Sequence, residues 1–440
     1  MTARLPSVHR RDLLRGLLAL TAAGCSATDR PSGPPQGPAT PPPADGPQPQ
    51  DPPVTPPPEV DASAATALAR GIDDFAIELY RKLGPADANT IVSPASIALA
   101  FAMLHAGARG KSAAELARVF HTGDDAAAHQ AAVAAALAKW NAPAPDVTLQ
   151  IANRLFGDDG VAFDPAYLEL GARVFGAALE PMPMRKQPDE ARKRINAWVE
   201  QQTRERIRDL LPAGSLTPAS RLVLVNAVYF KANWSDPFDK GQTRKGDFFA
   251  PKGKRSAMMM HRTDSMSMAR HDGATVLELP YGDGRYSFTV VLPDQRDGLA
   301  ALERRIDRAW LERARTGATG QRVALALPKF RIEAPEPLRL RTLLESLGLV
   351  EIFGPGADLT GIAPAKEQLV VSEAYHKAFI AVDEEGTEAA AATAIGVKAG
   401  AAPAPAEPIP VVVDHPFAFA LRDTESDAIL FMGRVVEPTV

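Results

Sequence analysis

The sequence predicts a mixed α and β fold in one large domain that covers residues 61–440. Three observations carry this prediction. Apolar residues make up 45% and charged residues 23% of the 440-residue chain, close to the globular average. Helical and strand-like hydrophobic patterns occur together, without the strict alternation of a doubly wound fold. No proline-rich break, long charge run or internal repeat divides the chain after Asp61.

The first 25 residues have the pattern of an export signal. A basic start precedes a short apolar stretch, Leu13 to Ala23, which is too short to span a bilayer. Arg10 and Arg11 resemble a twin-arginine signal. The stretch ends at Cys25 in a segment similar to a bacterial lipobox, where the cysteine is lipidated, although Ala22 stands where leucine is usual. We expect an exported lipoprotein of the cell envelope, or an extracellular protein if the signal is an ordinary one.

Residues 26–60 are expected to form a disordered tether. Fourteen of the 40 prolines fall between Pro31 and Pro58, and such a segment favours extended polyproline conformations over a packed core. Because Cys25 is the sole cysteine, no internal disulfide stabilises the domain that follows.

Within the domain, one helical stripe and three strand-like runs are prominent. The run Leu222–Phe230 is apolar except for Asn226, which is typical of a strand buried on both faces. Two further runs, Phe417–Leu421 and Ile429–Val436, are joined by a polar turn and predict a hairpin. A helical stripe is predicted to end at Pro212 and Gly214, and its apolar residues are Ile195, Trp198, Val199, Ile207, Leu210 and Leu211.

Charge and motif content argue against several classes of function. The formal net charge of −4, with basic and acidic residues interspersed, disfavours a nucleic-acid partner. The chain lacks a Gly-x-Ser-x-Gly elbow, a zinc helix and a complete phosphate loop, since His105 stands where the loop preceding Gly110-Lys111-Ser112 requires glycine. No two histidines have a metal-ligand spacing backed by an acid. We therefore expect no catalytic site, metal or cofactor.

Five motifs, in order along the domain, resemble those of the serpin family. They are Ser93-Pro94-Ala95-Ser96-Ile97, then Asn226 to Lys231 with Trp234, Pro237 and Phe238, then Leu327 to Phe330, then the hinge Asp383 to Thr393, and finally His415-Pro416-Phe417 with Leu430 to Val435. The resemblance implies a metastable α+β serpin fold of three β-sheets and about nine helices, with an exposed reactive-centre loop at about 384–410. It also implies a monomer that inhibits serine proteases by a suicide mechanism, in which the cleaved loop inserts into the large sheet while the protease is held as an acyl-enzyme.

The hinge of this loop is suited to insertion. A segment that becomes a central strand must direct alternate side chains into the core. Taking Thr387 as the first inward position makes every inward residue small or β-branched through Ala399, and leaves Glu388 and Lys398 on the other face. Gly386 supplies backbone freedom where the chain turns over. The hinge residues are Glu384, Glu385, Gly386, Thr387, Glu388, Ala389, Ala390, Ala391 and Ala392.

Proline limits where the loop can be cleaved. Proline cannot donate to a sheet ladder, so the insertable segment ends before Pro403. Counting along the loop as the family counts places the reactive bond between Gly400 and Ala401. Cleavage at Ala399 or Ala402 is an alternative, and all of these small residues suit an elastase- or subtilisin-like protease. Cleavage after Lys398 would instead suit a trypsin-like enzyme.

The resemblance also implies which residues control insertion. A polar cluster beneath the sheet, called the shutter, falls on Ser93, Ser96, Asn226 and His376. On physical grounds alone, Asn226 in an apolar strand needs a buried hydrogen-bond partner, and a histidine of a neighbouring strand is a suitable one. At the top of the sheet, called the breach, Lys329 is expected to pair with Glu384, next to Trp234. The alternative function is a serpin-fold binding or adhesion protein on the cell envelope that never traps a protease.

Overall fold

The computed structural model describes residues 61–83, 87–144, 146–177, 179–333, 336–387 and 407–439. The expected signal, the tether and most of the loop lie outside these residues. The described residues contain nine α-helices, as expected, and three short 3-10 helices. The α-helices are α1 (Ala62–Lys82), α2 (Pro94–Gly107), α3 (Gly110–Val119), α4 (Ala126–Trp140), α5 (Pro165–Phe175), α6 (Pro188–Gln202), α7 (Leu299–Glu303), α8 (Arg308–Thr316) and α9 (Leu340–Ser346). The 3-10 helices are η1 (Lys240–Gln242), η2 (Glu351–Phe353) and η3 (Ala365–Glu367).

A seven-stranded sheet forms the centre of the domain, with the strand order β10-β12-β13-β4-β2-β3 and with β11 also paired to β12. The strand between β12 and β4 has only two residues, and beyond it these two long strands pair directly and in parallel. The strands are β2 (Val147–Asp158), β3 (Glu180–Met182), β4 (Leu222–Asn233), β10 (Phe330–Glu333), β11 (Leu338–Arg339), β12 (Val371–Val382) and β13 (Gly386–Thr387).

The remaining strands form one nine-stranded sheet, so two hydrogen-bonded sheets stand in the described residues where three were expected. The reason is the length of β6, which pairs with β5 at its start, with β9 along its middle and with β7 at its end, and so joins two groups of strands. The strands are β1 (Thr90–Val92), β5 (Arg244–Ala250), β6 (Gly253–His271), β7 (Ala274–Tyr281), β8 (Tyr286–Pro293), β9 (Thr319–Pro328), β14 (Ile409–Val412), β15 (Phe417–Asp423) and β16 (Ile429–Val435).

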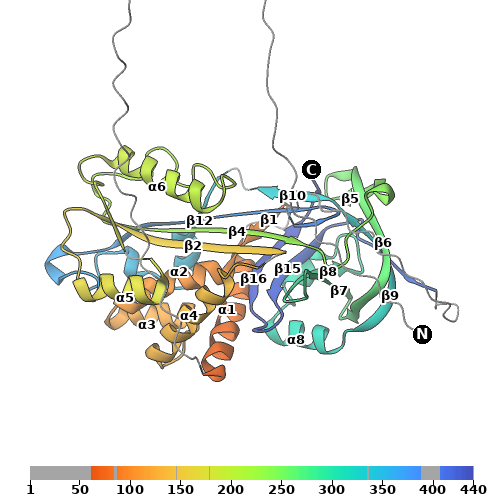
Figure 1. Cartoon of the computed structure of the whole chain (residues 1–440), viewed down its shortest axis with the longest axis horizontal. Coiled ribbons are helices and arrows are strands. Elements are labelled where there is room, and N and C mark those ends of the chain that lie inside the picture. The colour runs from red at the N-terminus through yellow and green to blue at the C-terminus, as the bar shows by residue number, and fades with distance from the viewer. Residues whose placement is uncertain are drawn as a thin grey trace, which may run out of the picture. The chain divides into compact units, whose positions relative to one another are not determined.

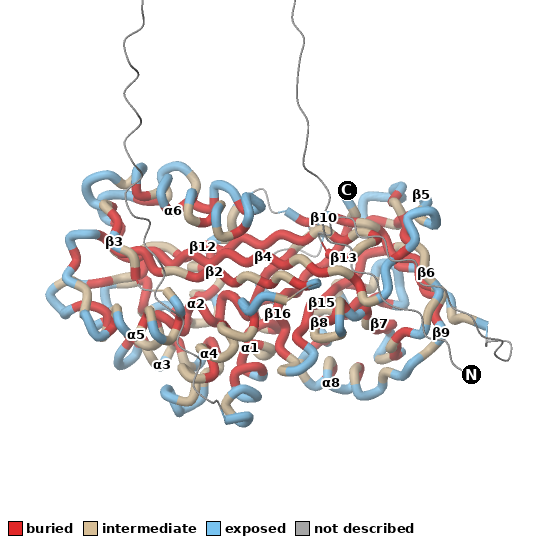
Figure 2. The backbone as a smooth tube through the Cα atoms, viewed as in Figure 1, coloured by how far each residue is buried: buried red, intermediate tan, exposed pale blue. Residues whose placement is uncertain are grey.

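The seven-stranded sheet is covered on both faces, which explains why β4 is apolar on both. Figure 1 shows α6 across one face and α2 with its neighbouring helices against the other. Val223 and Val225 of β4 pack in the cluster that contains α6, whereas Leu224 and Val228 pack in the main core with α2. The strands β2, β4 and β12 are accordingly buried over most of their length (Figure 2). The predicted buried strand and the predicted hairpin, β15 and β16, are both confirmed.

The predicted helical stripe is only half helical. Helix α6 ends at Gln202, and the chain then runs irregularly, with left-handed φ angles at Arg204 and Glu205. The Thr203 hydroxyl accepts a hydrogen bond from the Ile207 backbone N–H at 3.1 Å and so stabilises a turn that departs from the helix. The second half of the stripe is nevertheless buried against the sheet. Its burial was predicted correctly, and its helical conformation was not.

Candidate functional site

The candidate site is the seam between β12 and β4, which is open at one end. There the hinge residues Gly386 and Thr387 form β13 and lie between the two strands. Thr387 is opposite Val382 of β12 and Ala232 of β4, antiparallel to both. Farther along, the two strands pair with each other over Ala374–Ala378 and Leu224–Val228. The sheet has therefore admitted the first two residues of a potential new strand.

The two residues of β13 are closely confined. A side chain on Gly386 would place its Cβ 2.0 Å from the carbonyl oxygen of Ala232, so only glycine fits there. Thr387 is fully buried, at the inward position that the alternation assigns to it. Its hydroxyl lies 2.6 Å from the hydroxyl of Tyr281, at the end of β7 in the other sheet.

The turn before β13 is fastened to Trp234. The indole Nε1 donates to the carbonyl oxygen of Asp383 at 2.9 Å, and the Trp234 backbone N–H donates to that of Glu385 at 2.8 Å. The Asp383 carboxylate accepts the backbone N–H groups of Glu385 at 2.9 Å and Gly386 at 3.3 Å. Burial of Asp383 nevertheless outweighs these bonds and raises its pKa.

Two lysines pair with the glutamates of this turn. Lys329 Nζ lies 2.7 Å from Glu384 Oε2, as the resemblance implies, and the Glu384 side chain is only 7% exposed. Burial opposes ionisation of Glu384, but the hydrogen bond from Lys329 and other donors prevail and lower its pKa. Lys240 of η1 pairs with Glu385, a contact that sequence reasoning missed.

The predicted polar cluster is assembled midway along the seam. His376 Nε2 accepts the backbone N–H of Ser93 at 3.1 Å, so Nδ1 carries the proton and donates to the side-chain oxygen of Asn226. The Asn226 amide group donates to the hydroxyl of Ser96. Ser93 donates its own hydroxyl to the carbonyl oxygen of Leu430 at 2.7 Å. Burial lowers the pKa of His376 to about 3, and the imidazole is therefore neutral.

A fifth member of this cluster, Asn153, was not predicted. It lies on β2 directly opposite Asn226, accepts a hydrogen bond from the Asn226 amide and donates to the carbonyl oxygen of Ser96 at 3.2 Å. The sequence does contain an asparagine in this second strand. It does not indicate that β2 pairs with β4, and so Asn153 could not be assigned to the cluster.

The other predicted site residues lie outside the described residues. They are the rest of the hinge, Glu388 to Ala392, the reactive bond with its alternatives, Lys398 to Ala402, and Cys25. In the described part of the chain, no group of three or more metal-ligating side chains is present, and no helix is both long and apolar enough to cross a membrane.

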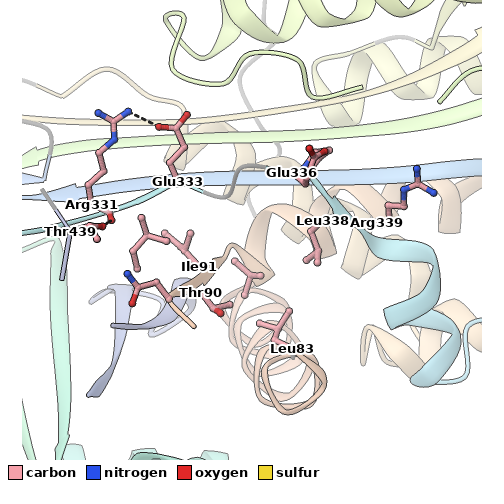
Figure 3. A pocket seen from close by; sticks show the side chains of 13 residues that line it. Leu83, Thr90, Ile91, Arg331, Glu333, Glu336, Leu338, Arg339 and Thr439 are labelled. Carbon is pink, nitrogen blue, oxygen red and sulfur yellow. Dashed lines mark hydrogen bonds and ion pairs between the residues drawn. The ribbon is translucent and has the colours of Figure 1, made fainter. Parts of the chain in front are cut away.

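A cavity of about 610 Å³ lies at the edge of the seven-stranded sheet and is lined in part by residues of β10 and β11. Figure 3 shows Leu83, Ile91 and Leu338 extending into it, while Arg331 pairs with Glu333 at its rim. None of its lining residues belongs to β12, β13 or β4, and the site does not include the cavity.

Comparison with known proteins agrees with this geometry. Residues 70–438 match the model of the serpin (serine protease inhibitor) family. The protein Iris of the tick Ixodes ricinus is 36% identical over 379 residues, which cover 84% of this chain and 99% of Iris. The leukocyte elastase inhibitor of Sus scrofa is 36% identical over 380 residues, covering 83% and 97%. A highly specific serpin of the insect Tenebrio molitor has a similar solved structure, with a TM-score of 0.77, 34% identity and coverage of 87% and 100%.

Proposed function

Because the chain belongs to the serpin family, we propose that it is a serine protease inhibitor that traps its target by inserting its cleaved loop as a strand. The observation that carries this proposal is β13, which already separates the ends of β12 and β4. In the proposed reaction the serine of the protease attacks the carbonyl carbon of the scissile residue and forms an ester. The peptide bond breaks, and the amine leaves with the C-terminal part of the chain. Insertion then removes the ester from the geometry needed for hydrolysis.

The register of β13 indicates what insertion would bring together. Gly386 is opposite Asn233 and Thr387 opposite Ala232, so each further loop residue pairs with the preceding residue of β4. Continued in this way, Glu388 would lie beside Lys231 on one face of the sheet. Thr393 would lie opposite Asn226, and on the β12 side opposite His376. Its hydroxyl would then replace the contact between these two side chains that strand separation breaks.

The length of β4 supports the proposed position of the reactive bond. The strand has 12 residues and begins at Leu222, which this register places opposite Val397. In this register β4 offers partners for Gly386 to Val397, and complete insertion would put the bond beyond Val397. Cleavage between Gly400 and Ala401 meets this condition and favours an elastase- or subtilisin-like target, while cleavage after Lys398 meets it as well. The name of the leukocyte elastase inhibitor agrees with a target of the first kind.

The test is incubation of the protein with elastase-, subtilisin- and trypsin-like proteases, followed by denaturing electrophoresis and mass spectrometry of the released peptide. We expect a covalent complex with a protease that prefers small residues. As a matched control, Thr387→Arg places a charge at a fully buried inward position and should be cleaved without trapping. If wild type and control both yield only cleaved chain, the protein is a binding protein with a serpin fold.

We further propose that the protein acts at the envelope of a bacterial cell, anchored by a lipid on Cys25. The support is the signal-like start and the position of the sole cysteine. Expression of wild type and Cys25→Ser, followed by fractionation and intact mass measurement, tests this. Wild type should carry lipid and sediment with membranes, and the variant should not. Equal distribution of the two would contradict the anchor.

A further inference from the structure

Tyr281 forms a hydrogen bond between the two sheets, at the end of the seam that holds β13. It ends β7 of the nine-stranded sheet, yet its hydroxyl lies 2.6 Å from that of Thr387 in the seven-stranded sheet. Both residues are fully buried. Either hydroxyl is able to donate, and because both residues are buried the hydrogen bond is costly to lose.

The phenol ring is held firmly in this position. It is stacked on the indole of Trp234, with ring centroids 4.4 Å apart and an angle of 10° between the planes. Phe230 packs edge-on against it at 5.3 Å. Trp234 in turn holds the turn before β13 through the carbonyl oxygens of Asp383 and Glu385. The hydroxyl of Tyr281 is therefore presented to the seam by a rigid aromatic support.

The Thr387 hydroxyl needs the Tyr281 hydroxyl as its hydrogen-bond partner, because the neighbouring strands pair only with the Thr387 backbone. Its backbone pairs with β12 and β4, but its side chain points into the core, where Tyr281 is the partner that the described structure provides. Without that partner, the threonine hydroxyl would be buried and unsatisfied, and leaving the seam would let water solvate it.

We propose that the Tyr281 hydroxyl is a positioning group that keeps Thr387 inserted at the open end of the seam and so sets how fast the rest of the loop follows. This inference rests on the proposed function for its effect on protease trapping. It does not rest on it for its effect on the uncleaved protein, where the hydroxyl controls only whether β13 stays between β12 and β4.

The first measurement is hydrogen exchange of the peptide that covers residues 383–387 in the full, uncleaved chain. Tyr281→Phe and Thr387→Val each leave one buried hydroxyl unpaired, and we expect each to speed exchange about tenfold. The double variant Tyr281→Phe/Thr387→Val leaves two apolar groups in contact and should return to within about twofold of wild type. Tyr286→Phe is the matched control, because it removes a phenol hydroxyl from the same aromatic cluster without contacting Thr387.

The second measurement is the partition of each variant between covalent complex and cleaved chain with the protease that wild type traps. We expect the ratio of cleaved chain to complex to rise about tenfold in both single variants and to recover in the double variant. Exchange at the wild-type rate in the single variants, or no recovery in the double variant, would overturn the role of the hydroxyl. A second outcome would overturn the control of insertion by the Tyr281 hydroxyl. In that outcome the exchange rates follow the prediction, but wild type and all variants give the same ratio of cleaved chain to complex. A wild type that traps nothing refutes the proposed function and leaves the exchange result to decide the inference.

Discussion

Acidification is expected to destabilise the uncleaved protein through His376. The ring is fully buried, and its Nε2 accepts the backbone N–H of Ser93 at 3.1 Å. Protonation of Nε2 would place a second proton against this donor and a charge in the core. Burial accordingly lowers the pKa of His376 to about 3, from 6.5 in an unfolded chain.

The sign and size of the effect follow from these two pKa values. Between pH 6.5 and 3 the unfolded chain binds a proton at this position and the folded chain does not, so stability falls as the pH falls. The slope approaches about 1.4 kcal/mol per pH unit well below pH 6.5. From pH 6.5 to pH 4.5 the loss is therefore about 2 to 3 kcal/mol.

The assay is urea unfolding of wild type and His376→Gln across this range, with stability taken from the midpoint and slope of each transition. The variant is the necessary control because Asp73 acts in the opposite direction. Burial raises the pKa of Asp73 to about 7, so its contribution to stability increases as the pH falls toward 3.8. Wild type should lose stability relative to the variant below pH 6.5. Two parallel pH profiles would refute the argument that His376 is held neutral by burial.

Three further predictions concern the hinge and the seam. Gly386→Ala forces a Cβ against the carbonyl oxygen of Ala232 and should cost about 1–3 kcal/mol of stability in urea unfolding; an unchanged midpoint would show that β13 is not confined. Lys329→Met removes the cation next to the nearly buried carboxylate of Glu384 and should destabilise the uncleaved chain by about 2 kcal/mol, while Lys329→Arg should retain most of the stability; equal midpoints for both variants would contradict this. Thr393→Arg should place a charge on the polar cluster during insertion and turn most of the inhibitor into cleaved substrate on denaturing gels; a normal yield of complex would count against the register.

Local features of the fold could be predicted from the sequence more fully than contacts between distant segments. The apolar pattern of Leu222–Phe230 predicted a doubly covered strand, because burial on both faces leaves its mark on every residue. The helical stripe failed beyond Gln202, since the same apolar residues are buried whether or not the backbone between them is helical. Two of the expected sheets are joined because β6 is long. The residues of β6 mix polar and apolar side chains without a clear pattern, so the sequence did not predict this length.

The site residues likewise include some that could be predicted from the sequence and some that could not. The pairing of Lys329 with Glu384 followed from motifs that the resemblance supplied, and its geometry is now evident. Asn153 and Tyr281 were missed because each reaches the seam from a strand distant in sequence, and nothing local to either residue indicates its partner. Such contacts arise from strand pairing and from the packing of one sheet on the other.

The most direct test of strand insertion is the thermal unfolding of the protein before and after cleavage of its loop, in the absence of protease during the scan. If the cleaved loop becomes a central strand between β12 and β4, the cleaved chain should unfold several degrees above the intact one, since in a domain of about 380 residues each additional kcal/mol is worth about 1 °C. Cleaved Thr387→Arg should show little of this gain. A cleaved wild-type chain that unfolds at the temperature of the intact one, or below it, would contradict insertion.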